Sequence, residues 1–269
     1  MLSWILYEDE EVLAVHKPAG IAVQTARAGQ ADVVSELKNH LCHHLCRSRG
    51  GSGMDAGWQE PYLGIVHRLD QPVEGLLVFA KTRRSAAFLT EQLRKQGDEG
   101  DFCKQYYAVL CGVPGEREGR LEDWLCKQPV KNGRHTEYVA VIKEPNYKVR
   151  NTNERQEPSI TVEEPKICRA VLEYRILQTR EEQGLALADI RIHTGRFHQI
   201  RAQMAYAGTP ILGDQKYGSE ESKALARALG VRSTALCAYR LSFLHPVSRE
   251  RMDFRVKPEN PAFSSFSQL

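Results

Sequence analysis

The chain opens with short apolar runs that are separated by polar turns. Residues 11–23, EVLAVHKPAGIAV, form an apolar run that ends at Pro18 and Gly20, which predicts a strand followed by a turn. In the next segment, 31–46, apolar residues recur at helical spacing, and Asp32 is placed to cap that helix. A strand and a capped helix are therefore expected within this part of the chain.

The pattern of short elements continues further along the chain. Two strand-like apolar runs, 64–66 and 76–80, flank a short polar turn. Residues 83–96, RRSAAFLTEQLRKQ, again space their apolar side chains as a helix does. The β-branched and aromatic residues of 103–112, CKQYYAVLCG, predict a strand that ends at its glycine.

Residues 113–166 are polar and weak in apolar periodicity, so we expect an irregular connection with a hairpin there and not a separate domain. Regular alternation returns at 185–193, and a helix is predicted over 198–208. A final pair of strands is expected at 235–246 and 251–257. Because strands and helices do not alternate regularly, the expected fold class is α+β, with a central mixed or antiparallel sheet flanked by helices.

Composition limits the environment of the protein more than its function. The formal net charge of +3 leans basic without defining a nucleic-acid binder. The seven cysteines are odd in number and scattered, and the opening residues reach charged positions too early for a secretory signal peptide. No apolar stretch approaches the roughly 20 residues that span a bilayer. We therefore expect a reduced, cytoplasmic protein with free thiols and no membrane span.

Three stretches concentrate residues that could carry chemistry. They are the polar turn after residue 66, the strand at 103–112 and the segment 194–218. The residues concerned are His67, Arg68 and Asp70 in the turn, Lys104, Tyr106 and Tyr107 in the strand, and Arg196, His198, Gln199 and Arg201 in the last segment. Taken singly, each has an ordinary structural explanation, such as a surface ion pair, packed tyrosines or a solvated helix face. Spacing alone indicates a soluble α+β protein that could bind RNA.

Taken together, these stretches resemble a known family. GIVHRLDQPVEGLLVFAK (64–81), KQYYAVLCG (104–112) and TGRFHQIRAQMAYAGTPILGDQKYG (194–218) resemble, in order and spacing, the three motifs of the RluA-type pseudouridine synthases. The segments 5–23 and 241–254 also look like the ends of that family. The resemblance covers nearly the whole chain apart from the connection that begins at residue 113.

The chain departs from the family pattern at three places. Gln71-Pro72-Val73-Glu74-Gly75 stands where the family commonly reads KDTSG, and Gln203 and Cys237 stand where histidines are frequent. None of these changes removes the Asp, Tyr or Arg that the family uses. They concern the subfamily and the substrate, and the reaction is expected to be the same.

The resemblance implies an enzyme that isomerises specific uridines in structured RNA, either rRNA or tRNA, to pseudouridine without a cofactor. By resemblance Asp70 is the catalytic carboxylate, Tyr106 stacks on the target base, and Arg201 is the charged partner that keeps Asp70 ionised. A uridine inside folded RNA must be flipped out to reach such a site. The sequence leaves open whether Asp70 attacks the sugar, attacks the base or takes a proton, and which uridine is modified.

RNA is the expected partner, and basic and imidazole side chains are its expected contacts. The residues predicted to bind RNA are His67, Arg68, Lys104, Arg196, His198, Arg47 and Arg49. Lys104 shares a strand face with Tyr106, whereas Tyr107 points to the opposite face and is expected to pack in the core. We expect one catalytic domain over 1–269, without a separate N-terminal RNA-binding domain, that acts as a monomer.

Two other interpretations compete with this one. The first is a non-catalytic RNA-binding protein that kept the synthase fold, although binding alone does not require the Asp, Tyr and Arg. The second is a carboxylate hydrolase, for which Glu74 is the only nearby second acid. A metal site is also conceivable in HLCHHLC, where Cys42 and Cys46 share a helical face. Because no second ligand pair follows at finger-like spacing, no metal is expected.

Overall fold

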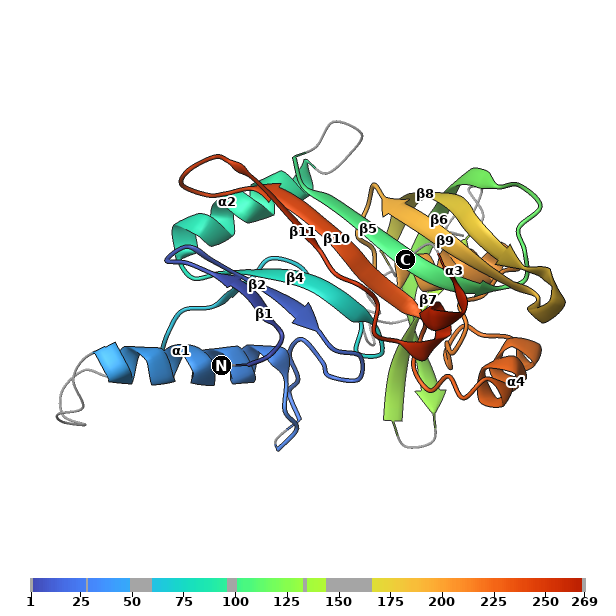
Figure 1. Ribbon diagram of the computed structural model, residues 1–269, viewed down its shortest axis with the longest axis horizontal. Helices are drawn as coiled ribbons and strands as arrows, with labels where there is room; N and C mark the ends of the chain where they lie inside the picture. The colour runs from blue at the N-terminus through green and yellow to red at the C-terminus, as the bar shows by residue number, and fades with distance from the viewer. Residues whose placement is uncertain are drawn as a thin grey trace, which may run out of the picture.

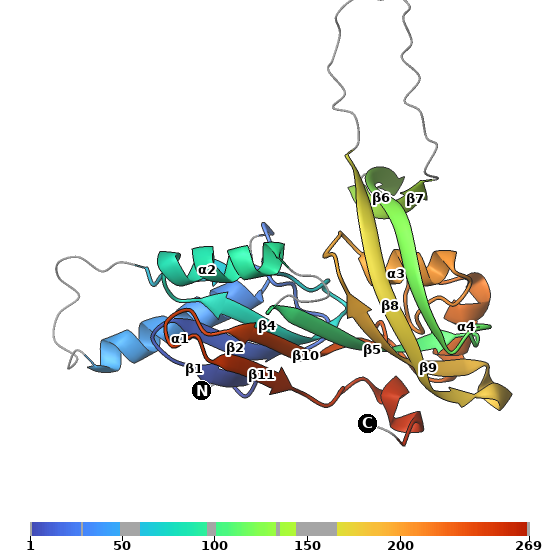
Figure 2. The ribbon, with the colours of Figure 1, turned by 90° about the horizontal axis from the view of Figure 1, so that it is seen from above.

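A computed structural model describes residues 2–27, 29–48, 60–95, 101–132, 135–143 and 166–267. Within these residues, eleven strands form one sheet, in which β1, β2, β4, β10, β5, β9, β8, β6 and β7 lie side by side in that order (Figures 1 and 2). The short strand β3 pairs with β4, and β11 pairs with β10. The parallel pair β4–β10 makes this antiparallel sheet a mixed one, which confirms the α+β prediction.

The elements have the following bounds. The strands of the first half of the sheet are β1 Ile5–Glu8, β2 Val12–Lys17, β3 Gly64–Ile65, β4 Glu74–Ala80, β10 Leu236–Leu244 and β11 Arg251–Arg255. Those of the second half are β5 Cys103–Cys111, β6 Glu118–Asn132, β7 His135–Lys143, β8 Ile167–Arg180 and β9 Leu185–Ile192. The helices are α1 Val33–Ser48, α2 Arg83–Arg94, α3 Gln199–Tyr206 and α4 Glu220–Ala228. None of the helices that the structure describes has the length and apolar character to span a membrane.

Strand β4 is buried on both faces, and its alternating side chains belong to two cores. Leu77 and Phe79 pack in the cluster that contains Leu37 of α1, whereas Leu76 and Val78 pack in the cluster around Leu89 of α2. Because successive side chains of a strand point to opposite faces, α1 and α2 cover opposite sides of the sheet. Burying each of these large side chains contributes roughly 1.5–3 kcal/mol.

Both helices of the first half begin at side-chain caps. The Ser35 amide donates to Asp32 Oδ1 over 2.8 Å, which confirms the cap predicted for α1. In the same way, the Ser85 amide donates to the Thr82 hydroxyl oxygen at the start of α2. These caps fix where each helix starts, although α1 ends two residues beyond the segment that we predicted.

The polar connection predicted over 113–166 needs a correction. Its described part contains β6 and β7, which pair from Trp124 opposite Lys143 to Asn132 opposite His135. The hairpin is therefore present, but it is long and regular, and β6 and β8 extend well beyond the body of the sheet (Figure 2). Strand β8 and helix α4 were not predicted either. The residues between 143 and 166 lie outside the described residues.

Candidate active site

The turn between β3 and β4 carries Asp70, which lies four residues before β4 begins. Leu69 and Val73 on either side are buried, and the Val73 amide donates to the Asp70 carbonyl oxygen over 3.1 Å. The strand that follows begins against β10 without room for a side chain at Gly75. A Cβ there would lie 2.4 Å from the Ala238 nitrogen, and the residue has a φ of +128°. The turn is thus held between two buried residues and a tight strand contact.

The segment before α3 is organised by Gln199. Its Oε1 accepts hydrogen bonds from the Thr194 hydroxyl and the Arg196 amide, at 2.8 and 3.0 Å. Its Nε2 donates to the Val171 carbonyl oxygen of β8 over 3.0 Å. The buried Ile200 and Met204 give the helix an apolar side. These contacts fix the first turn of α3, from which Arg201 projects.

Arg201 contacts two carboxylates at once. Its Nη1 donates to Asp70 Oδ2 over 2.8 Å, so the predicted pairing of Asp70 with Arg201 is present. Its Nε and Nη2 donate to the two oxygens of Asp214 over 2.7 and 2.8 Å. The guanidinium also lies over the Tyr217 ring, 5.1 Å from its centroid. This fork geometry suits arginine, and lysine could not reproduce it.

Asp214 is a member of this site to which the sequence analysis gave no role. It is 1% exposed and also accepts the Lys216 and Tyr217 amides. Burial alone would raise the pKa of Asp214, but hydrogen bonds and charge from Arg201 lower it below its ordinary value. Gly213 makes the position possible, because a Cβ there would lie 2.3 Å from the Ser233 carbonyl oxygen. The sequence did contain a signal for Asp214, because it lies in GDQKYG (213–218), the end of the third family motif.

His198 links the carboxylate Asp70 to the β6–β7 hairpin. Its Nε2 lies 3.8 Å from Asp70 Oδ2, and its Nδ1 lies 2.8 Å from the Tyr217 hydroxyl. That hydroxyl also accepts the Ala140 amide of β7 over 2.7 Å, which ties His198 to the hairpin. Burial lowers the pKa of His198 to about 4 although the charge of Asp70 raises it, and the ring is neutral at pH 7. Its left-handed backbone, with φ 52°, is of the strained kind found at functional sites.

Tyr106 lies on β5 and is almost completely buried. Burial raises the pKa of its phenol, and the charge of Asp70 raises it further, so the hydroxyl keeps its proton at neutral pH. The neighbouring Tyr107 points to the other face, where its ring stacks on Tyr239 with centroids 3.6 Å apart. The structure therefore brings the Tyr106 phenol within electrostatic reach of Asp70 and Cys237 and places Tyr107 elsewhere.

The residues predicted to bind RNA divide into buried and exposed groups. His67 is buried and accepts the Val78 amide at Nε2, and Lys104 is also buried, where burial lowers its pKa to about 8. Neither lies at the protein surface, and their predicted contact with RNA stays a prediction. Arg68 and Arg196 are exposed. The Arg47 side chain and all of Arg49 lie outside the described residues.

In the cysteine–histidine stretch of α1, His40 contacts a carboxylate of the sheet. His40 Nε2 lies 2.8 Å from Glu8 Oε2, which belongs to β1. This contact joins the helix to the edge strand of the sheet. The Cys46 side chain lies outside the described residues, so the predicted absence of a metal there stays a prediction.

Comparisons with known proteins agree with the fold and identify the family of the chain. The family model for RNA pseudouridylate synthase matches residues 11–206. The chain is 32% identical to ribosomal large subunit pseudouridine synthase D of Zymomonas mobilis, over 93% of this chain and 67% of the relative. It is 29% identical to an uncharacterized RNA pseudouridine synthase of Aquifex aeolicus, over 98% of this chain and 72% of that one.

Solved structures show the same fold. Human RNA pseudouridylate synthase domain containing 4 superposes with a TM-score of 0.63 at 21% identity, covering 95% of this chain and 89% of that one. The chain therefore belongs to the RNA pseudouridylate synthase family, and it is an isomerase that converts uridine in RNA to pseudouridine. This confirms the family resemblance and the type of reaction predicted from the motifs.

Proposed function

We propose that this enzyme modifies uridine in ribosomal RNA, and that Asp70 is the catalytic carboxylate. The observation that carries the proposal is the hydrogen bond from Arg201 Nη1 to Asp70 Oδ2, over 2.8 Å. The same guanidinium is held in place by Asp214, the second carboxylate of the site. Within the described residues, the polar side-chain contacts of the Asp70 carboxylate go to Oδ2. The second oxygen can therefore face a substrate. The name of the Zymomonas relative supports ribosomal RNA as the substrate class.

The reaction rearranges bonds without adding atoms. The bond from ribose C1′ to uracil N1 breaks, a bond from C1′ to C5 forms, the proton on C5 leaves, and N1 is protonated. A carboxylate at the sugar–base junction can divide this difficult exchange into easier steps. Arg201 keeps Asp70 charged when a flipped base excludes water. The protonated phenol of Tyr106 provides a flat surface against the base and a hydrogen-bond donor beside it.

RNA outside the pocket is expected to contact an aromatic group next to His198. The Lys127 ammonium of β6 lies 4.2 Å from the ring centroid of Tyr138 and 5.0 Å from that of Phe197. The Phe197 ring stacks on His198 with centroids 3.6 Å apart. Tyr138 and Phe197 are exposed, and bases stacked on such rings gain roughly 1–3 kcal/mol each. These side chains lead from the surface towards Asp70.

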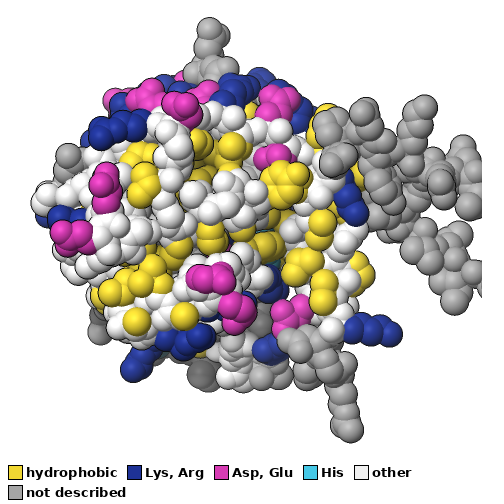
Figure 3. All heavy atoms as spheres, turned by 90° about the vertical axis from the view of Figure 1, so that its right-hand side faces the viewer, with side chains coloured by type: hydrophobic (Ala, Val, Ile, Leu, Met, Phe, Trp, Pro, Cys, Tyr) yellow, Lys and Arg dark blue, Asp and Glu magenta, His cyan; other side chains and the backbone are white. Residues whose placement is uncertain are grey.

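A second face of the molecule lacks, among its described residues, the clustered positive charge that attracts RNA. On the face that turns towards the right-hand side of Figure 1, acidic and basic side chains are interspersed around scattered hydrophobic ones (Figure 3). An RNA backbone is attracted by clustered Lys and Arg, and mixed charges largely cancel at a distance. We therefore assign RNA docking to the surface around Arg68, Arg196 and the aromatic group.

The substitution Asp70→Asn tests the assignment because it keeps the shape and removes the carboxylate. We expect no detectable pseudouridine in transcribed rRNA fragments, while RNA affinity stays within about tenfold of wild type. The matched control is Asp101→Asn, which removes an exposed carboxylate that pairs with Arg251. Turnover by Asp70→Asn at a rate near that of the control would refute the role of Asp70.

A further inference from the structure

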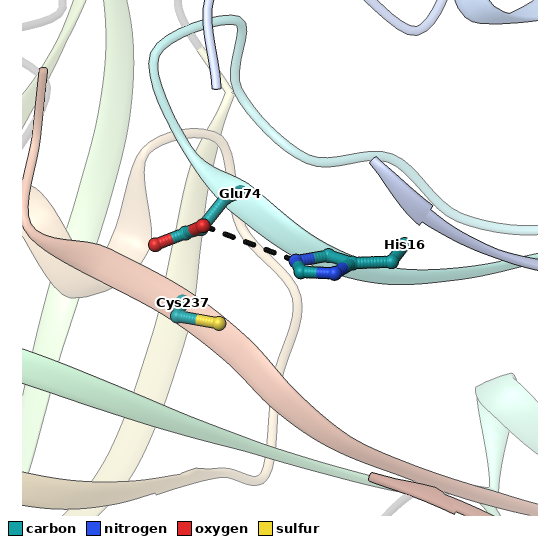
Figure 4. Close-up of side chains that lie close together, drawn as sticks. All are labelled: His16, Glu74 and Cys237. Atoms are coloured by element: carbon teal, nitrogen blue, oxygen red, sulfur yellow. Dashed lines mark ion pairs between the residues drawn. The ribbon is translucent and has the colours of Figure 1, made fainter. Parts of the chain in front are cut away.

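A second cluster of reactive side chains borders the active site, on three adjacent strands. His16 belongs to β2, Glu74 to β4 and Cys237 to β10, and Glu74 pairs directly with Cys237 in the parallel register. One ligand atom from each residue lies within 4.8 Å of the other two. Figure 4 shows the three side chains pointing toward one another. Glu74 and Cys237 are two of the positions where the chain departs from its family's pattern.

The imidazole of His16 is oriented as a metal ligand would be. Its Nε2 is buried, has no hydrogen-bond partner among the residues that the structure describes, and lies 3.9 Å from Glu74 Oε2. Its Nδ1 faces the Glu259 carboxylate, 3.7 Å from Oε1. In metal sites a histidine commonly binds the ion through one nitrogen and directs the other N–H to a carboxylate. The free nitrogen of His16 points into the cluster.

Backbone amides hold the Glu74 carboxylate in place, but no Lys or Arg of the described residues forms an ion pair with it. It is 2% exposed, and its two oxygens accept the Glu259 and Asn260 amides over 2.9 and 3.0 Å. The Lys17 ammonium lies near enough to interact with Glu74, but it donates its hydrogen bonds to three backbone carbonyl oxygens. A buried carboxylate in such surroundings calls for a proton or a cation.

We propose that His16 Nε2, the Glu74 carboxylate and Cys237 Sγ bind a zinc ion. Imidazole, carboxylate and thiolate are the donors that zinc accepts, whereas magnesium and calcium require oxygen ligands. Bond lengths of about 2.0–2.3 Å to zinc require the three ligand atoms to approach one another by about 1 Å, which side-chain rotation can provide. Water completes the fourth position.

The ion would join three strands and the chain segment at Glu259 and Asn260 beneath the turn that carries Asp70. Its expected role is structural, since within the described residues no hydrogen bond or ion pair joins His16, Glu74 or Cys237 to Asp70. The inference is thus independent of the proposed catalytic role of Asp70. It also differs from the stretch of α1 considered in the sequence, because none of its ligands comes from that helix.

Cobalt replaces zinc in such sites and reports thiolate ligation by a charge-transfer absorption in the near ultraviolet. We would titrate chelator-stripped full-length protein with cobalt and then displace the cobalt with zinc. The expected result for wild type is this absorption, saturating at one equivalent and lost on zinc addition. Cys237→Ala and His16→Asn should abolish or strongly weaken it. Cys126→Ala, which removes another buried thiol on β6, should retain it.

The titration is decisive in either direction. No thiolate absorption in wild type, or equal absorption in Cys237→Ala, would overturn the site. Should the variants fail to fold, the thermal midpoint of stripped wild type is measured with and without zinc. A zinc-dependent rise, together with one bound ion in native mass spectrometry, supports the proposal, and neither effect at micromolar zinc refutes it.

Discussion

Asp214 and Glu74 are both buried carboxylates, and their surroundings have opposite effects on them. Asp214 is 1% exposed and Glu74 is 2% exposed, and each accepts two backbone amides. Asp214 also receives a two-pronged contact from Arg201, whereas Glu74 has no such cation. The pKa of Asp214 is consequently lowered below its ordinary 3.8, while burial raises the pKa of Glu74 above its ordinary 4.5.

The difference shows that pairing with an arginine, and not burial alone, determines whether a buried carboxylate is charged. In the active site, Arg201 stands between Asp70 and Asp214, so the charge that chemistry needs is stabilised before substrate arrives. In the cluster around Glu74, the same degree of burial leaves the charge to be balanced by a proton or by an added ion. Four substitutions or treatments test this contrast.

The largest effect is expected for Arg201→Met, which keeps much of the side-chain volume and leaves two carboxylates without their cation. We expect the single-turnover rate at pH 7 to fall by about 10²-fold or more. The free energy of unfolding should fall by about 3–5 kcal/mol, because one member of a buried ion pair has been removed. Rapid-quench assays and urea unfolding measure the two quantities.

The matched control for that substitution is Arg251→Met, which removes an exposed arginine paired with Asp101. Exposed ion pairs contribute about 0–1 kcal/mol, so this variant should retain its rate and nearly all of its stability. A rate for Arg201→Met equal to that of the control would show that another group supports Asp70. Arg68 or Arg196 would then be the next residues to replace.

A smaller, pH-dependent effect is expected for Asp214→Asn. The folded pKa of Asp214 lies below its unfolded value, so its carboxylate contributes stability above about pH 4 and loses it as pH falls through the folded pKa. The variant should be less stable than wild type by about 1–3 kcal/mol at pH 7, and the gap should narrow towards pH 3. Urea unfolding across that range tests it, and a gap independent of pH would contradict the assignment.

For the substitution Glu74→Gln, the pH dependence of stability should have the opposite sign. Because the folded pKa of Glu74 is raised, ionising it costs stability as pH rises from about 4.5 through the folded pKa. The stability of the variant relative to wild type should therefore improve between pH 4 and pH 7, by on the order of 1 kcal/mol. The measurement uses metal-free protein. A relative stability that falls with pH would mean that Glu74 has a cation partner in the folded chain.

Much of the fold could be predicted because its elements carry local signals. Asp32 before an amphipathic run marked α1, alternating apolar residues marked β9, and β-branched and aromatic residues marked β5. The hairpin strand β6 lacked such a signal, since only Leu125 and Cys126 of its described side chains are buried. A strand exposed on both faces has no required apolar period. Helix α4 did have capping signals at Ser219 and in its acidic first turn, which the analysis did not use.

The candidate site was less accessible to local reasoning. The Asp70–Arg201 contact joins residues 131 positions apart, and only the family resemblance suggested it. His67 stands beside Arg68 in the same turn, yet it is buried, because a polar turn does not reveal which side chain points inward. His16, Glu74 and Cys237 come together only through the order of β2, β4 and β10, which no local pattern specifies.

The smallest effect is expected when divalent metal is removed. No step of the isomerisation needs a Lewis acid, so EDTA-treated and desalted enzyme, added to RNA already folded in magnesium, should keep its rate within about twofold. If zinc occupies the cluster around Glu74, the same treatment should lower the thermal midpoint of the protein, and the assay is therefore run well below that midpoint. If activity is lost on chelation and restored by zinc at such a temperature, the ion must act on the turn that carries Asp70. The metal cluster would then belong to the catalytic site and would not be a separate structural element.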